Sequence, residues 1–139
     1  MKPKCFLLGM LGGVAVIALL LLVFGVRFTS DVMAYDTLKE IDAKGTVIAA
    51  KDFACPASQG ELGGHLVLKT ADGEYEVHLA PARVLRSLHW KFAPGEQIEV
   101  RGAKVRFRGK PGLLARQITM GNEIYTLRDP NGVLVVKQQ

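Results

Sequence analysis

Hydrophobic residues divide the chain into an uncharged N-terminal run and a polar remainder with short alternating segments. Residues 5–26 form a run of twenty-two residues without one charged side chain. An α-helix rises about 1.5 Å per residue, so the run reaches roughly 33 Å, enough to cross a hydrocarbon core of about 30 Å. The pattern predicts a single transmembrane helix over residues 5–26, after a leader at residues 1–4.

Charges next to the run predict its orientation. Lys2 and Lys4 precede it without an acidic residue, and the positive-inside rule places such an end in the cytoplasm. We expect an uncleaved signal-anchor with the remainder of the chain outside the cytoplasm, in the periplasm of a Gram-negative bacterium. The alternative is a signal peptide cleaved near residues 32–34. Gly9 and Gly13 lie four residues apart, a spacing typical of helix packing in membranes.

The segment after the run predicts a juxtamembrane helix or stalk over residues 27–43. Ser30 and Asp31 offer an N-cap, and apolar residues follow at three-residue spacing. A first strand is predicted at residues 46–50. A loop rich in glycine, with a proline, follows over residues 54–64.

Two alternating segments, residues 65–70 and 74–79, predict a β-hairpin. They flank Asp72 and Gly73, and Asp-Gly between such segments is a strong hairpin signal. With these two residues as the turn, one face of the hairpin is apolar and points to the core. The predicted pairs on that face are Thr70 with Tyr75, Leu68 with Val77 and Leu66 with Leu79.

A helix is predicted after the hairpin. Pro81 stands at its favoured first position, and apolar residues continue at helical spacing to Phe92. Trp90 falls on the opposite face, together with Arg83 and Arg86. The alternative is a helix that ends early and lets Trp90 fold into the core.

The rest of the chain predicts further strands. Residues 98–108 alternate, and a slip of phase at Gly102 predicts a β-bulge in a curved strand. Residues 110–112 predict a turn into a fifth strand over residues 113–120. A β-hairpin is predicted within residues 122–139.

The predicted order is strand, hairpin, helix, long curved strand and strand. This is the order of an OB-fold, a five-stranded Greek-key barrel with its helix between strands three and four. Residues 94–102 and 113–118 also resemble the matching passages of OB-fold proteins. We therefore expect a mainly β fold, with an OB-fold-like barrel over residues 44–121 and a C-terminal hairpin extension over residues 122–139.

An anchor followed by an exported barrel resembles the membrane-anchored haem chaperone family of cytochrome c maturation. Members of that family attach haem through a histidine, with a tyrosine nearby, just after the last barrel strand. Residues 120–125 of this chain include Tyr125 but no histidine. The resemblance therefore implies the anchor and the barrel, and it does not extend to haem attachment.

Charge is unevenly distributed beyond the anchor. Residues 27–80 hold five basic and nine acidic residues, whereas residues 81–139 hold eleven basic and four acidic residues. A basic second half favours an acidic protein surface, anionic lipid or nucleic acid as partner. Nucleic acid is disfavoured because the predicted outer strand faces offer almost no aromatic side chains for base stacking. The candidate partner-binding residues are Arg83, Arg86, Trp90, Arg101, Lys104, Arg106, Arg108 and Lys110.

Three residues are candidate metal ligands. His65 and His78 are predicted on the outward face of the hairpin in diagonal register, about 7–8 Å apart. Cys55 lies in the adjoining loop, and imidazole with thiolate suits copper or zinc. The alternative is a pair of surface histidines without a ligand. Cys5 lies at the other end of the membrane run, so no disulfide with Cys55 forms within one chain.

Motifs for catalysis are not recognisable in the sequence. It has no nucleophile motif, no glycine-rich phosphate loop and no paired-carboxylate motif, and about 100 residues of barrel leave little room for a buried active site. We therefore expect a non-catalytic accessory module without a cofactor, bound to the lipid bilayer and docked on a larger membrane protein complex. The alternatives are metal or haem handling through Cys55, His65 and His78, and polyanion binding by the basic strand.

Overall fold

The computed structural model describes residues 33–58 and 60–139. The chain divides into two compact units, residues 1–30 and 31–139, and the fold below is that of the second. None of the helices in the described part has the length and apolar character needed to span a membrane. The transmembrane helix predicted at residues 5–26, with Gly9 and Gly13, lies outside the described residues.

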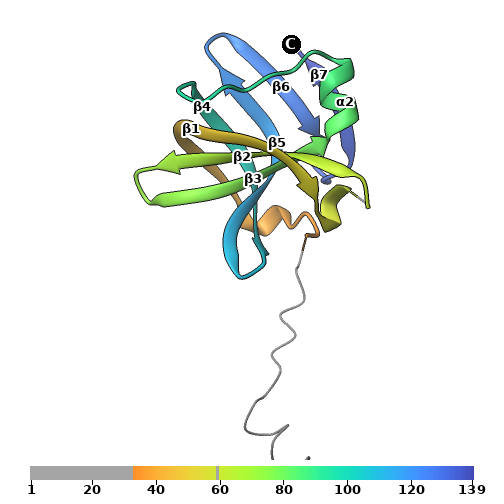
Figure 1. The fold of residues 1–139 in the computed structure, drawn as a ribbon. Coiled ribbons are helices and arrows are strands. Elements are labelled where there is room, and N and C mark those ends of the chain that lie inside the picture. The colour runs from red at the N-terminus through yellow and green to blue at the C-terminus, as the bar shows by residue number, and fades with distance from the viewer. Residues whose placement is uncertain (1–32, 59) are drawn as a thin grey trace, which may run out of the picture. The chain divides into compact units, whose positions relative to one another are not determined.

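Strands dominate the described part of the chain, with three short helical segments between or before them (Figure 1). The elements, in order, are η1 (Thr37–Lys39), β1 (Glu40–Ala54), η2 (Pro56–Ser58), β2 (Leu62–Thr70), β3 (Gly73–Pro81), α2 (Ala82–Ser87), β4 (Gln97–Phe107), β5 (Lys110–Met120), β6 (Glu123–Arg128) and β7 (Leu134–Gln138). The mainly β prediction is thereby confirmed.

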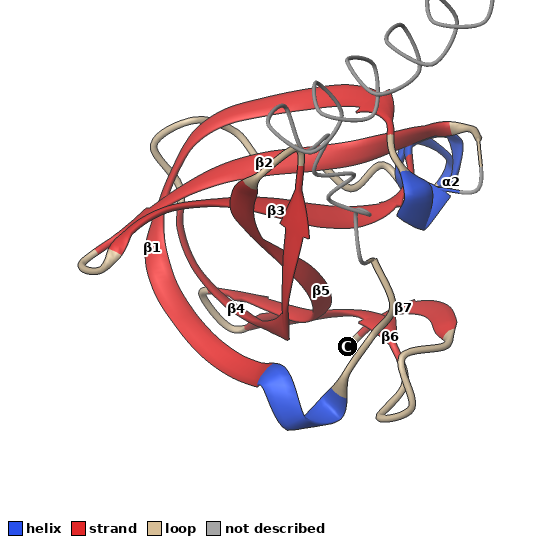
Figure 2. Cartoon of the chain, turned by 90° about the horizontal axis from the view of Figure 1, so that it is seen from below, coloured by secondary structure: helices blue, strands red, loops and turns tan. Residues whose placement is uncertain are grey.

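One sheet closes on itself. Its order is β3-β2-β1-β4-β5-β6-β7, and an additional parallel pairing of β3 with β5 closes the first five strands into a barrel. Figure 2 shows these strands curving around a common interior. The fifteen residues of β1 serve two neighbours, because its first part pairs with β4 and its later part with β2. Gly45 lies where the two pairings meet, and a Cβ there would be 2.2 Å from the carbonyl oxygen of Lys69.

Aliphatic side chains fill the barrel, and aromatic side chains close one end of it. Leu68, Val100 and Ile118 are fully buried in the main hydrophobic cluster. Trp90 packs edge-to-face on Tyr125 with ring centroids 5.0 Å apart. Burial of this apolar surface contributes roughly 25 cal/mol for each Å² removed from water.

The helix predicted as far as Phe92 is wrong in length. α2 ends at Ser87, and His89 has a left-handed backbone with φ of 57°. The chain therefore leaves the helical path and returns Trp90 to the barrel, where its Nε1 donates to Gln138 Oε1 at 3.2 Å. The structure therefore confirms the alternative expectation, in which the helix ends early and Trp90 is buried in the core.

The predicted hairpin register is wrong by two residues. Ala71 and Asp72 form the turn, and Gly73 already pairs with Thr70. A shift of two keeps every side chain on its face of the sheet, so the predicted core face holds. The observed pairs include Leu68 with Tyr75, Leu66 with Val77 and His65 with His78.

Two other boundaries differ from the prediction. Residues 40–43 belong to β1 and not to a stalk helix, and residues 33–39, the other described part of that segment, contain the single helical turn η1. The turn predicted at residues 110–112 lies inside β5, because Arg108 and Gly109 both have positive φ and make the tight turn themselves. The bulge predicted at Gly102 is confirmed by the register shift between Arg101 and Gly102.

The close approach of β4 and β5 at the bulge generates a test. An added Cβ at Gly102 would lie 2.5 Å from the carbonyl oxygen of Leu114. We expect Gly102→Ala to lower the free energy of unfolding by about 1–3 kcal/mol. Urea titration of the full-length protein in detergent, followed by the fluorescence of the single tryptophan, measures it. Lys104→Ala, at an exposed site of the same strand, should change stability by no more than about 0.5 kcal/mol.

Candidate metal centre

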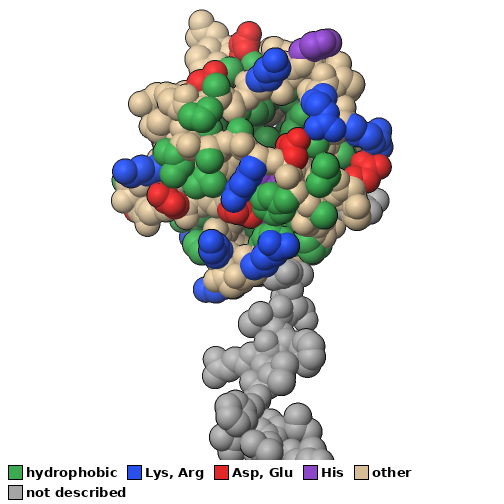
Figure 3. Space-filling view, viewed as in Figure 1, with side chains coloured by type: hydrophobic (Ala, Val, Ile, Leu, Met, Phe, Trp, Pro, Cys, Tyr) green, Lys and Arg blue, Asp and Glu red, His purple; other side chains and the backbone are tan. Residues whose placement is uncertain are grey.

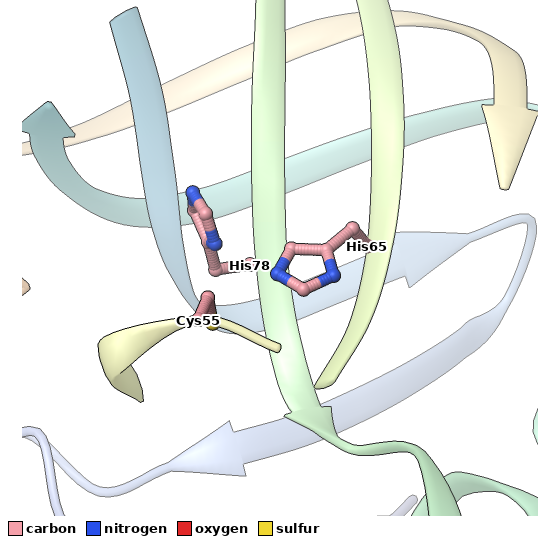
Figure 4. Close-up of side chains that lie close together, drawn as sticks. All are labelled: Cys55, His65 and His78. Atoms are coloured by element: carbon pink, nitrogen blue, oxygen red, sulfur yellow. The ribbon is translucent and has the colours of Figure 1, made fainter. Parts of the chain in front are cut away.

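Cys55, His65 and His78 meet on one side of the barrel wall (Figure 4). Each offers one ligand atom, and these atoms all lie within 4.8 Å of one another. The two imidazole rings stand edge-to-face with centroids 4.7 Å apart. The three candidate ligands proposed from the sequence are therefore brought together.

The two histidines are buried, which corrects the outward exposure expected for them. They face each other directly across β2 and β3, on the side of the hairpin opposite to Leu66. The ring of Phe53 stacks on His65 with centroids 3.6 Å apart, and Phe107 packs against the edge of His78 at 5.4 Å. These aromatic side chains cover what would otherwise be an exposed face, and the exposed fractions of His65 and His78 fall to 2% and 1%.

The turn η2 holds Cys55 over the histidines. The backbone N–H of Ser58 donates to the carbonyl oxygen of Cys55 at 3.0 Å, and the N–H of Cys55 donates to Ser58 Oγ at 3.2 Å. The thiol is buried and free, and its Sγ lies 3.7 Å from Ser58 Oγ. Gly63 keeps the site open, because a Cβ there would lie 3.1 Å from Cε1 of His65.

The ring nitrogens of the two histidines are unusual because they are buried without hydrogen-bond partners. Nδ1 and Nε2 of both His65 and His78 are buried and have no hydrogen-bond partner. Most buried side-chain polar atoms in proteins are paired, and each unpaired one costs about 1–3 kcal/mol. An ion bound by both rings and the thiol would partner one nitrogen of each ring, which makes this group a candidate metal site.

A small cavity lies between these side chains. Its volume is about 10 Å³, and its lining includes Cys55, His65, His78 and Arg128. That volume is close to the minimum needed for one water molecule. The space therefore suits a single ion and excludes a larger ligand.

Burial decides the protonation of the groups around the cavity. It lowers the pKa of His78 to about 3, and the positive charges of Arg128 and Lys51 act in the same direction. Burial also lowers the pKa of His65. Neutral imidazoles carry the free lone pair that a metal requires. Burial lowers the pKa of Arg128 to about 10, so its guanidinium stays charged at neutral pH.

Glu76 lies at the outer end of His78. Its Oε1 is 3.9 Å from Nε2 of His78, and its Oε2 is 3.2 Å from Nζ of Lys51. Carboxylates commonly orient metal-ligating histidines by accepting the second ring N–H. Glu76 is placed for that role after a small closing movement, on the wall of a surface cavity of about 290 Å³ that Phe53 and Phe107 also line.

The distances set how far the site must close. Typical metal–nitrogen and metal–sulfur bonds are about 2.0–2.1 Å and 2.3 Å, so two ligand atoms on one trigonal or tetrahedral ion are about 3.3–3.8 Å apart. The ligand atoms here lie within 4.8 Å of one another, so the most widely separated pair must approach by about 1 Å to bind one ion.

Most of the residues predicted for partner binding are exposed, and several of them make contacts within the chain. Trp90 is buried, and Arg101 makes a bidentate pair with Asp42 at 2.6 and 3.0 Å. Arg83 pairs with Glu61 and Arg86 with Asp52, each at 2.9 Å. Arg106 donates to the carbonyl oxygen of Gly109 at 3.0 Å, and the guanidinium of Arg108 lies 4.9 Å from the Phe107 ring centre. Lys104 and Lys110 are exposed on β4 and at the start of β5.

Surface charge of both signs is mixed on the face seen in Figure 3, where basic side chains lie among acidic and hydrophobic ones.

The sequence analysis did not identify two residues that contact or line the candidate metal site, Arg128 and Ser58. In the sequence, Arg128 resembles any arginine of a predicted strand, and Ser58 resembles any serine of a predicted loop. Their roles depend on the Arg128 side chain reaching β3 and β5 from β6, and on η2 packing against β2 and β3, and no local pattern signals either.

Residues 39–125 match the model of the MamS/MamX magnetosome protein family. The match covers more than half of the chain and includes Cys55, His65 and His78, and the chain belongs to this family of membrane-associated bacterial proteins. A search of curated proteins gave no match.

The buried histidines generate a pH test on the metal-free protein. The folded state keeps His78 neutral down to a pKa of about 3, whereas the unfolded chain protonates it near its ordinary pKa of about 6.5. The unfolded state binds more protons between these values, so stability is lost as pH falls through this window. The slope reaches about 1.4 kcal/mol per pH unit for such a histidine.

Urea titrations of the chelator-treated protein at several pH values measure this loss. His78→Leu should flatten the dependence, and His89→Asn, at an exposed histidine, should leave it as in the unaltered chain. Identical pH dependence in the unaltered chain and His78→Leu would show that His78 is not held neutral.

Proposed function

We propose that this member of the MamS/MamX family is a membrane-anchored, non-catalytic accessory protein whose barrel binds one soft transition-metal ion through Cys55, His65 and His78. Two imidazoles with one thiolate suit copper and zinc. The single observation that carries the proposal is the set of four unpartnered ring nitrogens packed against a free thiol.

The architecture of the barrel supports a role in binding an ion rather than in catalysis. The first five strands close in the order β1-β2-β3-β5-β4, with α2 between β3 and β4, and this arrangement favours an OB-fold. Structural metal sites are closed, whereas catalytic ones keep an open coordination position for substrate. Phe53 and Phe107 cover the cluster, and the cavity leaves room for little beyond the ion.

The site disfavours the haem alternative. A cavity of about 10 Å³ has no space for a porphyrin, and Cys55 is held against Ser58 by the hydrogen bonds of η2. The polyanion alternative is weakened because Arg83, Arg86 and Arg101 are already paired with carboxylates.

The membrane anchor remains part of the proposal. It is supported by the uncharged run at residues 5–26 behind Lys2 and Lys4 and by membership of a magnetosome protein family. The proposed topology places the N-terminus in the cytoplasm and the barrel outside it. Docking on a membrane protein complex is proposed at the exposed end of β4 and β5, which carries Lys104 and Lys110.

Metal analysis of the full-length protein tests the proposed function. The protein is extracted in detergent under reducing conditions, treated with a chelator, incubated separately with Cu(I) and with Zn(II), and desalted. We expect about one equivalent of at least one of these ions per chain, because three ligands converge on one cavity.

Variants show whether the retained ion occupies this cluster. Cys55→Ser and His78→Gln should each lose the metal by weakening the ligand set about 10-fold or more, and His89→Asn should retain it. A protein that keeps neither ion, or that keeps it equally well in all three variants, would contradict the proposed function.

A further inference from the structure

We propose that the ion held by this cluster is Cu(I), bound by three ligands in an N₂S set, and not a divalent ion. This inference rests on the proposed metal-binding function and adds the identity and charge of the ion. It comes from the charge of the cavity wall, the number of ligands and the exclusion of water.

Charge in the cavity wall favours a monovalent ion. Arg128 lines the same cavity as the three ligands, and its Nη1 donates to the backbone carbonyl oxygens of Leu79, at 2.7 Å, and Ala115. It is 5% exposed, and among the described residues no carboxylate forms an ion pair with it. The cavity therefore already contains one buried positive charge that water does not screen.

Metal binding changes this charge by different amounts for the two ions. Cu(I) binds the thiolate of Cys55 and displaces the thiol proton to solvent, so one positive charge replaces another. Zn(II) displaces the same proton and leaves the cluster one charge more positive, beside Arg128. Glu76 offsets that addition only in part, because its carboxylate is also paired with Lys51 at 3.2 Å. Uncompensated buried charge is strongly unfavourable.

The number of available ligands also favours Cu(I). The described residues supply three ligand atoms within 4.8 Å of one another, one each from Cys55, His65 and His78. Zinc almost always completes a tetrahedron of four ligands, and trigonal His₂Cys sites that also hold Cu(II) normally add a weak axial ligand, which the described residues do not place in this group. Thiolate and imidazole suit both copper and zinc, so the number of ligands, rather than their type, favours Cu(I) over zinc at this site.

Exclusion of water removes the usual source of a fourth ligand. The cavity of about 10 Å³ has room for about one water-sized body, and a bound ion would occupy that space. Phe53 lies flat on His65, and Phe107 closes the edge of His78. A three-coordinate monovalent ion meets these limits, and a four-coordinate divalent ion does not.

Competition between the two ions tests the inference. Full-length protein in detergent is prepared metal-free and anaerobic, mixed with equimolar Cu(I) and Zn(II), desalted and analysed for both metals. We expect about one copper and no zinc per chain, and about a hundredfold excess of zinc should fail to displace the copper. X-ray absorption at the copper edge should show three ligands, two nitrogen and one sulfur.

Each outcome separates this inference from the proposed function. Retention of zinc in preference to copper, or a four-ligand copper spectrum, overturns the inference and leaves the metal-binding function standing. Retention of neither ion removes both. The N₂S assignment is also overturned if the Cys55→Ser protein retains as much copper as the control variant His89→Asn.

Arg128 supplies an independent readout. Arg128→Gln removes the buried charge, so zinc affinity should rise relative to copper affinity on the order of tenfold. Arg128→Lys keeps the charge and should leave the preference unchanged. An unchanged copper-to-zinc ratio in a folded Arg128→Gln protein overturns the charge argument. If that variant fails to fold, as judged by Trp90 fluorescence, the competition in the unaltered protein still decides the identity of the ion.

Discussion

Parallel pairing of β3 with β5 is the constraint on which the rest of the structure depends. It joins the two ends of a five-strand circuit, pairing Glu76 with Gly112 and His78 with Leu114. A Cβ at Gly112 would lie 2.8 Å from the carbonyl oxygen of Glu76 and 3.3 Å from Nε2 of His78. Glycine at position 112 therefore permits both barrel closure and the position of the His78 ring, so the fold and the candidate site depend on the same residue.

Closure also explains why a polar cluster is buried in so small a domain. The sheet bends until Phe53 and Phe107 cover the outer side of the β2–β3 hairpin, and η2 lays Cys55 over it. Desolvation keeps the imidazoles neutral, and it leaves their nitrogens without partners. Groups that are costly to bury alone become good ligands when an ion of suitable charge occupies the cavity.

The sequence predicts local features well and long-range placement poorly. Period-two alternation and the slip at Gly102 are local, and the β4 bulge was predicted from them. The hairpin register was wrong by two because Gly73, with φ of 129°, serves as a strand residue as well as a turn signal. The burial of His65 and the position of Arg128 depend on residues far away in the sequence, and alternation carries no information about them. Cys55, His65 and His78 could be named as candidate metal ligands from the sequence because their residue types, unlike their surroundings, are local information.

Anomalous X-ray diffraction from copper-loaded crystals tests the central claim most directly. Data collected on both sides of the copper absorption edge locate the ion without assumptions about its ligands. A single anomalous peak within about 2.3 Å of Cys55 Sγ and one nitrogen of each of His65 and His78 is the predicted result. An empty cavity in which the rings hydrogen-bond to each other or to water, with copper elsewhere on the surface, would contradict it.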